Sequence, residues 1–269
     1  MREELATLTN QYIELSKTYL DLERLNFYLL SHHSTAIEGG TLTALETEIF
    51  LEKGLTAKGK PLEHHLMVKN HFEALTFILK SAQDKVSIET DFIKAINACV
   101  MKDTGSVHNT ALGSFDSAKG DLRLVNVRAG ITGDSYLNFQ KVPIFLRDLC
   151  KDLQDKISKV NQVYEINELA FLAHYQLVTI HPFVDGNGRS SRLLMNYIQA
   201  FHQLPMTVVF VEDRREYIEA IISTRKSENI QFFLDFMFSQ HLKFLKLEIQ
   251  KMKSIEKKST KTKNIRLLF

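Results

Sequence analysis

Hydrophobic residues recur along most of this chain at intervals of three or four, the spacing that places them on one face of an α-helix. Residues 3–32 follow this pattern, and we predict one long helix there. Its apolar stripe is formed by Leu5, Leu8, Tyr12, Leu15, Tyr19 and Leu22. Further helices are predicted over residues 62–82, 89–101, 143–158, 166–178, 188–202 and 214–225, and from residue 228 into the C-terminal tail. The pattern predicts an all-α fold.

Two local signals add detail to this pattern. The letters TALE, residues 43–46, match a capping box, in which Thr43 caps a backbone N–H and Glu46 reaches back to the start of the helix. We expect that helix to run through Lys53 and to end near Gly54. Residues 102–142 are the least helical part, and residues 122–139 combine β-branched residues with a glycine-rich middle. This predicts one short β-hairpin.

Composition and charge restrict the class of protein. The chain has 269 residues, of which 44% are hydrophobic and 25% charged, as in an ordinary soluble protein. Its two cysteines, Cys99 and Cys150, form no disulfide framework, which favours a reducing compartment. The N-terminal stretch lacks the apolar core of a signal peptide, and no apolar run approaches the roughly 20 residues of a membrane span. We expect a cytoplasmic protein without membrane segments.

The charge is uneven although the net charge is only +2. From Lys246 to the end there are eight Lys and Arg residues against two Glu. Such a tail suits either a solvated helix end or a contact with nucleic acid or acidic lipid. The solvated helix end is the simpler interpretation, and nucleic-acid binding is not expected.

The densest set of reactive side chains is HPFVDGNGRSSR, residues 181–192, at the predicted start of a helix. A helix N-terminus presents unpaired N–H groups and attracts anions. Gly186 and Gly188 let the backbone approach a ligand closely, and Asn187 can donate from its amide. Arg189 and Arg192 lie three residues apart, so both can face the same end of the helix. These residues suit a polyphosphate.

Two further residues of the same stretch add reactive chemistry. Asp185 supplies one hard oxygen ligand, which suits Mg²⁺ because this ion takes few protein carboxylates when substrate phosphates complete its shell. His181 has the near-neutral pKa of a general base. The set therefore indicates phosphoryl or nucleotidyl transfer. The alternative is a helix cap, a turn and two solvated arginines, which explains each feature singly but not the complete set.

Residues 181–192 resemble the signature of the Fic (filamentation induced by cAMP) domain, His-Pro-Phe-x-(Asp/Glu)-Gly-Asn-Gly-Arg-x-x-Arg, at every fixed position. The resemblance implies transfer of AMP from ATP to a protein Ser, Thr or Tyr hydroxyl, with release of pyrophosphate. It also implies a Fic-type helical domain with a small hairpin flap. In this family His181 would be the base and Asp185 the Mg²⁺ ligand.

The same resemblance assigns the phosphate contacts. Gly186, Asn187 and Gly188 would form the anion hole for the α- and β-phosphates. Arg189 would contact the phosphates, and Arg192 would hold the γ-phosphate.

A second match lies upstream, in STAIEGGTLTALET, residues 34–47, which is similar to the inhibitory motif of the family. It resembles the class with an N-terminal inhibitory helix. The resemblance implies that Ser34 and Glu38, one helical turn apart, restrain Arg192 and withhold it from the γ-phosphate. Glu-Gly-Gly stands where relatives often have Glu-Gly-Asn, and Gly39 is a plausible helix stop. Alone, Glu38 would be taken for an ordinary surface acid.

Weaker matches extend the resemblance to about residues 34–239. Residues 119–139 occupy the place of the flap, which aligns a target segment by strand addition. Tyr217, in VEDRREYIEAI, matches a segment that lines the adenine pocket, although it is otherwise a half-buried helix residue. His64 and His65, in the helix that follows the inhibitory segment, suit packing better than a metal site.

We therefore expect a self-inhibited protein adenylyltransferase that uses ATP with Mg²⁺ and modifies a hydroxyl-bearing protein. Its expected segments are an N-terminal helix (1–33), an inhibitory segment and connector (34–60), a Fic core (61–245) and a basic tail (246–269). Two alternatives stay open. The same site can remove AMP, with Glu38 positioning a water, or the chain can be a nucleotide-sensing regulatory module. Leu25, Phe27 and Leu29 suit either the core or a homodimer contact.

Overall fold

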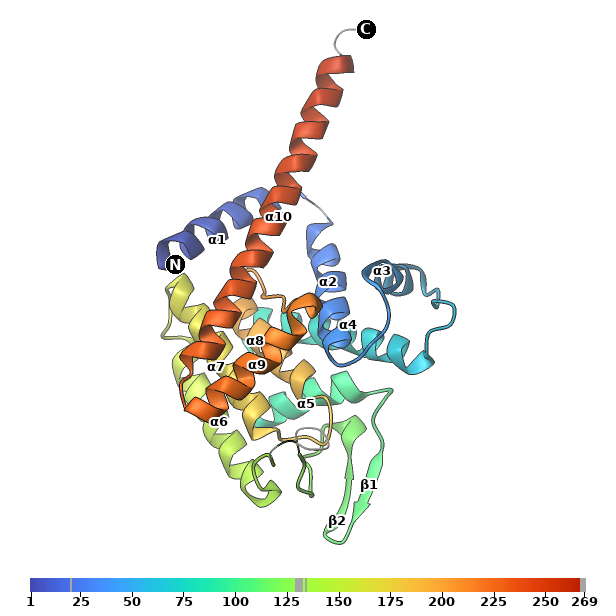
Figure 1. Cartoon of the computed structure of the whole chain (residues 1–269), viewed down its shortest axis with the longest axis vertical. Helices are drawn as coiled ribbons and strands as arrows, with labels where there is room; N and C mark the ends of the chain where they lie inside the picture. Colours follow the sequence, from blue (N-terminus) through green and yellow to red (C-terminus); the bar gives the residue numbers. More distant parts are fainter. Residues whose placement is uncertain (20, 129–132, 134, 267–269) are drawn as a thin grey trace.

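The computed structural model describes residues 1–19, 21–128, 133 and 135–266, with side chains up to residue 255. It confirms a helical fold with one small antiparallel hairpin. Figure 1 shows the arrangement. The elements in chain order are α1 (Arg2–Ser16), α2 (Leu22–Ile37), α3 (Ala44–Lys53), α4 (Leu62–Gln83), α5 (Thr90–Met101), β1 (Val107–Thr110), β2 (Gly113–Asp116), α6 (Val142–Ile157), α7 (Val163–Ile180), α8 (Asn187–Phe201), α9 (Arg214–Ser227) and α10 (Gln231–Arg266).

Helix α8 lies at the centre of the molecule, where α4, α5 and α7 pack around it. Its side chains are buried on every side, and the hydrophobic ones join the main core. A helix buried all round has its position fixed by its neighbours. Because α8 begins inside the motif of residues 181–192, the core also fixes the place of that motif.

Helix α2 ends close to the start of α8, and its exit is set by local signals that the sequence contains. Gly39 has a φ of 98°, which suits a glycine after a helix end. The predicted capping box is confirmed, since Thr43 Oγ1 accepts from the Glu46 N–H at 3.2 Å and the Glu46 carboxylate accepts from the Thr43 N–H at 2.8 Å. Helix α3 then ends at Gly54, as predicted.

The predicted single helix over residues 3–32 is wrong, because the chain breaks between α1 and α2. The hydroxyls of Ser16 and Thr18 donate to the carbonyls of Ile13 and Leu15, three residues back. The N–H groups of Thr18 and Tyr19 also bond three residues back, which tightens and ends the helix. Hydrophobic periodicity continues through the break, so the pattern alone could not reveal it.

The hairpin also differs from its prediction in position. Strands β1 and β2 pair in antiparallel fashion upstream of residues 122–139. Within the predicted stretch there is one antiparallel bridge, between Arg128 and Ser135, and the Tyr136 N–H donates to the Val127 carbonyl at 3.0 Å. Residues 129–132 and 134 lie outside the described residues. The strands β1 and β2 are short and polar, so they carried no clear alternation.

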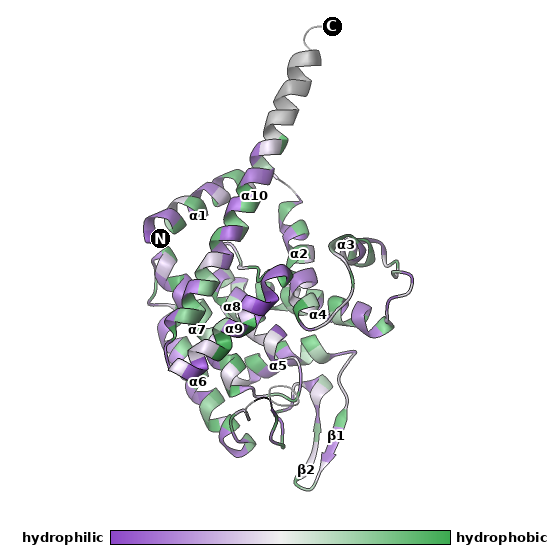
Figure 2. Ribbon diagram, in the orientation of Figure 1, coloured by the Kyte–Doolittle hydropathy of each residue, from purple (hydrophilic) through white to green (hydrophobic). Residues whose placement is uncertain are grey.

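Helix α10 runs past the other helices and extends beyond them (Figure 1). Hydrophilic and hydrophobic residues alternate along α1 and along α10 up to residue 255, as expected for helices with one face on the core (Figure 2). The segment boundaries expected after residues 33 and 245 fall inside α2 and α10 respectively. Within the described part of the chain, no helix is long and apolar enough to cross a membrane.

Candidate active site

Residues 181–186 of the motif form the loop between α7 and α8, which has a left-handed residue at each end. His181 closes α7 with a φ of 53° and a ψ of 59°, and its N–H donates to the Leu177 carbonyl at 3.0 Å. Gly186 precedes α8 with a φ of 79°. A Cβ at Gly186 would lie 2.6 Å from Nδ2 of Asn97, so only glycine fits there.

The first turn of α8 has the features of an anion-binding site. Its N–H groups have no partner within the helix, and no described side chain caps this end. A carboxylate already lies there, because a Cβ built on Gly188 would be 2.2 Å from Oε1 of Glu38. Glu38 therefore fills the volume next to the cradle that the sequence predicted for phosphate.

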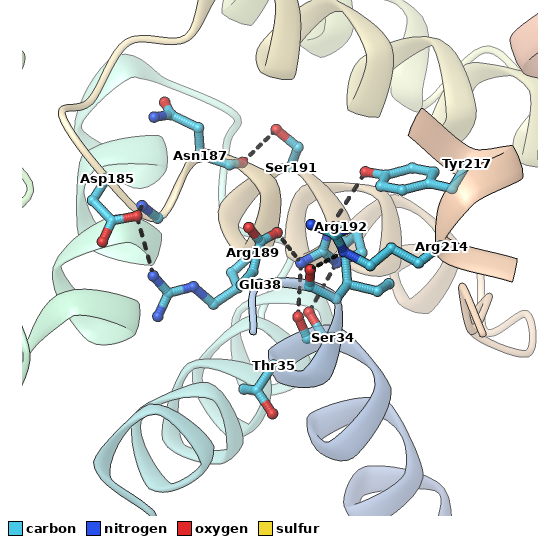
Figure 3. A network of polar contacts seen from close by, with 12 residues as sticks. Ser34, Thr35, Glu38, Asp185, Asn187, Arg189, Ser191, Arg192, Arg214 and Tyr217 are labelled. Carbon is cyan, nitrogen blue, oxygen red and sulfur yellow. Dashed lines mark hydrogen bonds and ion pairs between the residues drawn. The ribbon is translucent and has the colours of Figure 1, made fainter. Parts of the chain in front are cut away.

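Glu38 and Arg192 form an ion pair of 2.7 Å between Oε1 and Nη2 (Figure 3). The guanidinium is buried, whereas the Glu38 side chain keeps 34% of its surface exposed. Burial opposes ionisation of Glu38, but the charge and hydrogen bond of Arg192 outweigh it and hold the pKa of the carboxyl below its ordinary value. Ser34 completes the contact, since Arg192 Nε donates to its hydroxyl and Nη2 to its carbonyl, both at 2.9 Å.

The remaining side of Arg192 faces α9. Its Nη1 donates to the hydroxyl of Tyr217 at 3.3 Å, and that hydroxyl lies 2.9 Å from Nε2 of His174. Burial lowers the pKa of His174 well below its ordinary value, so its neutral Nε2 accepts the Tyr217 proton. Tyr217 is fully buried rather than half-buried, with 2% of its surface exposed. Its part in an adenine pocket stays a prediction.

His181 is held as a neutral imidazole. Burial lowers its pKa to about 4. Nδ1 lies 3.2 Å from the carbonyl of Val178, which can only accept, so Nδ1 carries the proton and Nε2 keeps a free lone pair. The ring stacks on Tyr136 with centroids 3.7 Å apart, and the guanidinium of Arg225 lies 5.0 Å from the centre of the Tyr136 ring.

Asp185 projects from the loop with 66% of its side chain exposed. Its Oδ1 accepts from the Gly186 N–H at 2.5 Å and lies 3.4 Å from Nη2 of Arg189. Among the described residues, no group of three or more His, Cys, Asp or Glu side chains could hold a metal ion. A lone exposed carboxylate beside an anion cradle fits Mg²⁺ that phosphates and water also coordinate.

The side chains of Arg189 and Asn187, which were both expected to contact a ligand, bond other residues of the protein in this structure. Arg189 is buried against α5, with Nη2 also 3.5 Å from the Met101 sulfur, and its Nε and Nη1 have no partner among the described residues. Figure 3 shows it extended toward Asp185. The Asn187 side chain bonds both main-chain groups of Phe183, so it closes the loop.

Two residues that support the site carried no sequence signal. Asn97, on α5, donates from Nδ2 to the Asp185 carbonyl and to the Ser190 hydroxyl, both at 3.1 Å. Arg214, at the start of α9, donates to the Ile37 carbonyl at 2.6 Å and so holds the end of α2. Both contacts join elements distant in sequence.

The structure thus brings two distant segments onto Arg192, the end of α2 with Ser34 and Glu38 and α9 with Tyr217. His181 and Asp185 lie in the loop that leads into α8, and residues 187–189 form the first turn of that helix.

Comparison with known proteins identifies the family of this region. Residues 87–199 match the Fic/DOC family. Among curated proteins, the protein adenylyltransferase fic-1 of Caenorhabditis elegans is 30% identical over 217 residues, and the protein adenylyltransferase Fic of Drosophila melanogaster is 33% identical over 192 residues. These matches cover 78% and 69% of this chain but 39% and 35% of the relatives. The chain thus spans well under half the length of these relatives.

Solved structures agree with this result over nearly the whole chain. A Fic domain containing signaling protein from Bacteroides thetaiotaomicron superposes with a TM-score of 0.78 at 26% identity, covering 93% of this chain and 97% of that one. Fic-1 of Caenorhabditis elegans superposes with a TM-score of 0.75 at 26% identity, covering 94% and 73%. The chain therefore carries a Fic domain of the Fic/DOC family, with α8 at its centre.

Proposed function

We propose that this chain is a self-inhibited protein adenylyltransferase, which transfers AMP from ATP to a Ser, Thr or Tyr hydroxyl of a target protein. The observation that carries the proposal is the Glu38 carboxylate, which sits on Arg192 at the start of α8, where a phosphate group would bind. The names of the curated relatives support the reaction type.

His181 acts as the base in this reaction. The target hydroxyl oxygen attacks the α-phosphorus of ATP, the bond from that phosphorus to the bridging oxygen of the β-phosphate breaks, and pyrophosphate leaves. The hydroxyl proton goes to Nε2 of His181, which is free because Nδ1 bonds the Val178 carbonyl. The low pKa of His181 in the resting site, about 4, keeps this nitrogen unprotonated at neutral pH.

The cradle holds the triphosphate. The first-turn N–H groups of α8 face the anion, and Gly188 leaves the room for it. Arg192 binds the γ-phosphate once Glu38 is displaced, and Asp185 would hold Mg²⁺ together with the phosphates. When bound, Mg²⁺ neutralises charge on the departing pyrophosphate.

Inhibition follows from competition for one cation. Arg192 already has acceptors for Nε, Nη1 and Nη2, so a γ-phosphate must replace Glu38 rather than add to it. Leaving a buried arginine without its carboxylate costs about 3–5 kcal/mol. ATP therefore binds weakly or in an unproductive position until Glu38 moves away.

The test compares wild type with Glu38→Gly and with the charge-neutral Glu38→Gln. Each is incubated with Mg²⁺, candidate target protein and ATP labelled at either the α- or the γ-phosphate. We expect α-label in protein, on the order of 100- to 1,000-fold more with Glu38→Gly than with wild type, because about 3–5 kcal/mol of restraint is removed. His181→Ala in the Glu38→Gly background should retain ATP binding and lose labelling.

The outcomes separate the candidate functions. Incorporation of γ-label would mean phosphorylation and would refute AMP transfer. ATP binding without labelling by any variant would favour a nucleotide-sensing module. Release of AMP from pre-labelled target by wild type, but not by Glu38→Gln, would favour AMP removal with Glu38 orienting a water.

A further inference from the structure

Arg123 carries a buried guanidinium in a segment whose side chains the sequence leaves without a role. Only 1% of its surface is exposed, and within the described residues no carboxylate forms an ion pair with it. Burial lowers the pKa of Arg123, yet a guanidinium stays charged at neutral pH. A buried charge without a counterion is unfavourable unless hydrogen bonds satisfy it. The stabilisation therefore comes from the groups that accept its hydrogen bonds.

All of these acceptors are main-chain carbonyls. Nε donates to the His181 carbonyl at 2.8 Å, Nη1 to that of Val125 at 2.7 Å and Nη2 to that of Leu137 at 2.5 Å. The backbone N–H of Arg123 also donates to the Pro182 carbonyl at 3.1 Å. A planar, rigid guanidinium that bonds three carbonyls fixes their relative positions.

The His181 carbonyl is the acceptor that matters for chemistry. His181 has left-handed backbone angles, which a non-glycine residue holds only when its surroundings enforce them. Two consecutive carbonyls, those of His181 and Pro182, are bonded by the side chain and the main chain of Arg123. Arg123 therefore fixes the peptide unit from which the imidazole projects.

The other two carbonyls belong to the two arms of residues 122–139, which are residues 122–128 before the antiparallel bridge and residues 135–139 after it. Val125 precedes the Arg128–Ser135 bridge and Leu137 follows it. Tyr136, next to Leu137, stacks on the imidazole of His181 at 3.7 Å. The Arg123 guanidinium thus fixes the backbone position of His181 and also that of Leu137, which is next to the tyrosine that stacks on the imidazole.

We propose that Arg123 is a positioning residue for AMP transfer. Its side chain fixes the position of the His181 backbone relative to residues 122–128 and 135–139. The inference rests on the proposed function, with His181 as base. Lysine keeps the charge but offers donors from a single nitrogen, so it cannot hold three carbonyls in one plane.

The experiment measures initial rates of α-label transfer in the Glu38→Gly background, with full-length protein and varied ATP. Arg123→Lys keeps the charge, and Arg123→Gln keeps a planar donor of shorter reach. We expect kcat to fall about 100-fold in both, as when a catalytic group is misplaced by about 1 Å. The KM for ATP should stay within about twofold, because the phosphate cradle is untouched.

Thr207→Val is the matched control. Thr207 is buried beyond the far end of α8, where its hydroxyl bonds Gln199 and His241. This variant should lower the Tm as the Arg123 variants do and leave kcat unchanged.

Unchanged kcat in whichever Arg123 variant folds would overturn the inference, and so would an equal loss of kcat in Thr207→Val. A rise in the KM for ATP with kcat unchanged would also overturn it, since Arg123 would then support nucleotide binding. Absence of α-label with the Glu38→Gly parent itself would sink the proposed function, and this inference with it.

Discussion

Gly188 leaves open the space that the carboxylate of Glu38 fills, since a methyl group at residue 188 would lie 2.2 Å from Oε1. The carboxylate belongs to the residue that caps the C-terminal end of α2, and the glycine belongs to α8. The contact therefore joins the proposed inhibitory segment to the proposed phosphate cradle, and it is possible because residue 188 has no Cβ. Anything placed there competes with Glu38.

Gly188→Ala should therefore push Glu38 away from Arg192 without creating an active enzyme. The added methyl group displaces the flexible carboxylate, which loses the ion pair, but it also occupies the phosphate site. Wild type should lose about 3–5 kcal/mol of unfolding free energy, because the buried Arg192 loses its carboxylate, and the Glu38→Gly background much less, because it contains neither the clash nor the ion pair. Urea unfolding of the four proteins measures this coupling. Additive losses, or α-labelling by Gly188→Ala, would contradict it.

Ser34→Ala should release the proposed inhibition in part. It removes the hydroxyl that accepts from Arg192 Nε and keeps the Ser34 carbonyl and Glu38. We expect a labelling rate on the order of tenfold above wild type, below that of Glu38→Gly, because a hydrogen bond to a charged group contributes about 1.5–3 kcal/mol. Thr35→Ala is the control, since the Thr35 hydroxyl bonds only carbonyls of its own helix. Equal rates for Ser34→Ala and Thr35→Ala would remove Ser34 from the restraint.

Tyr217→Phe should destabilise the fold more than a surface change would. The hydroxyl accepts from Arg192 and donates to His174, so its removal leaves a buried donor and a buried acceptor unsatisfied, at about 1–3 kcal/mol. Tyr175→Phe is the matched control, because Tyr175 packs on Phe233 of α10 as Tyr217 packs on Phe236 of the same helix, and it should change the stability by less than about 0.5 kcal/mol. Chemical denaturation distinguishes them, and similar losses would refute the role of the Tyr217 hydroxyl.

Acid should destabilise the protein well before its carboxylates titrate. Burial lowers the pKa of His33 and His181 to about 4 and that of His71 and His241 to about 3. An unfolded histidine binds a proton near pH 6.5, so below that pH the unfolded state gains protons that the folded state lacks. Each group then removes about 1.4 kcal/mol per pH unit until the pH reaches its folded pKa.

Urea unfolding at pH 7.5, 6.0 and 5.0 tests this, with His241→Phe as the comparison. The unfolding free energy of that variant should fall less steeply with decreasing pH than that of wild type. The difference in slope should correspond to about one proton, because one buried histidine no longer titrates. A slope equal to that of wild type would mean that His241 is not kept neutral by burial.

The sequence predicted most of the helices because their apolar faces follow one period, and the capping box located α3 closely. The break after Ser16 escaped because hydroxyl bonds to the backbone leave the hydrophobic pattern intact. The strands β1 and β2 escaped because four residues are too few to establish an alternation.

The candidate site divides in the same way. Residues 181–192 are contiguous, so their spacing alone indicates a phosphate site. Glu38 and Arg192 are 154 positions apart, and only the family resemblance linked them. The partners Asn97, Arg123 and His174 had no sequence signal, because a buried polar residue acquires its function from tertiary neighbours that periodicity does not identify.

At residue 181 the requirements of stability and of the proposed activity conflict, because the backbone is left-handed and the proposed base is a histidine. Glycine would adopt those angles with less strain. Substitutions selected for thermal resistance alone would therefore tend to replace this histidine and discard the proposed base. A stabilisation programme for this protein should leave residue 181 untouched and look for its gains elsewhere, for example in the short break between α1 and α2.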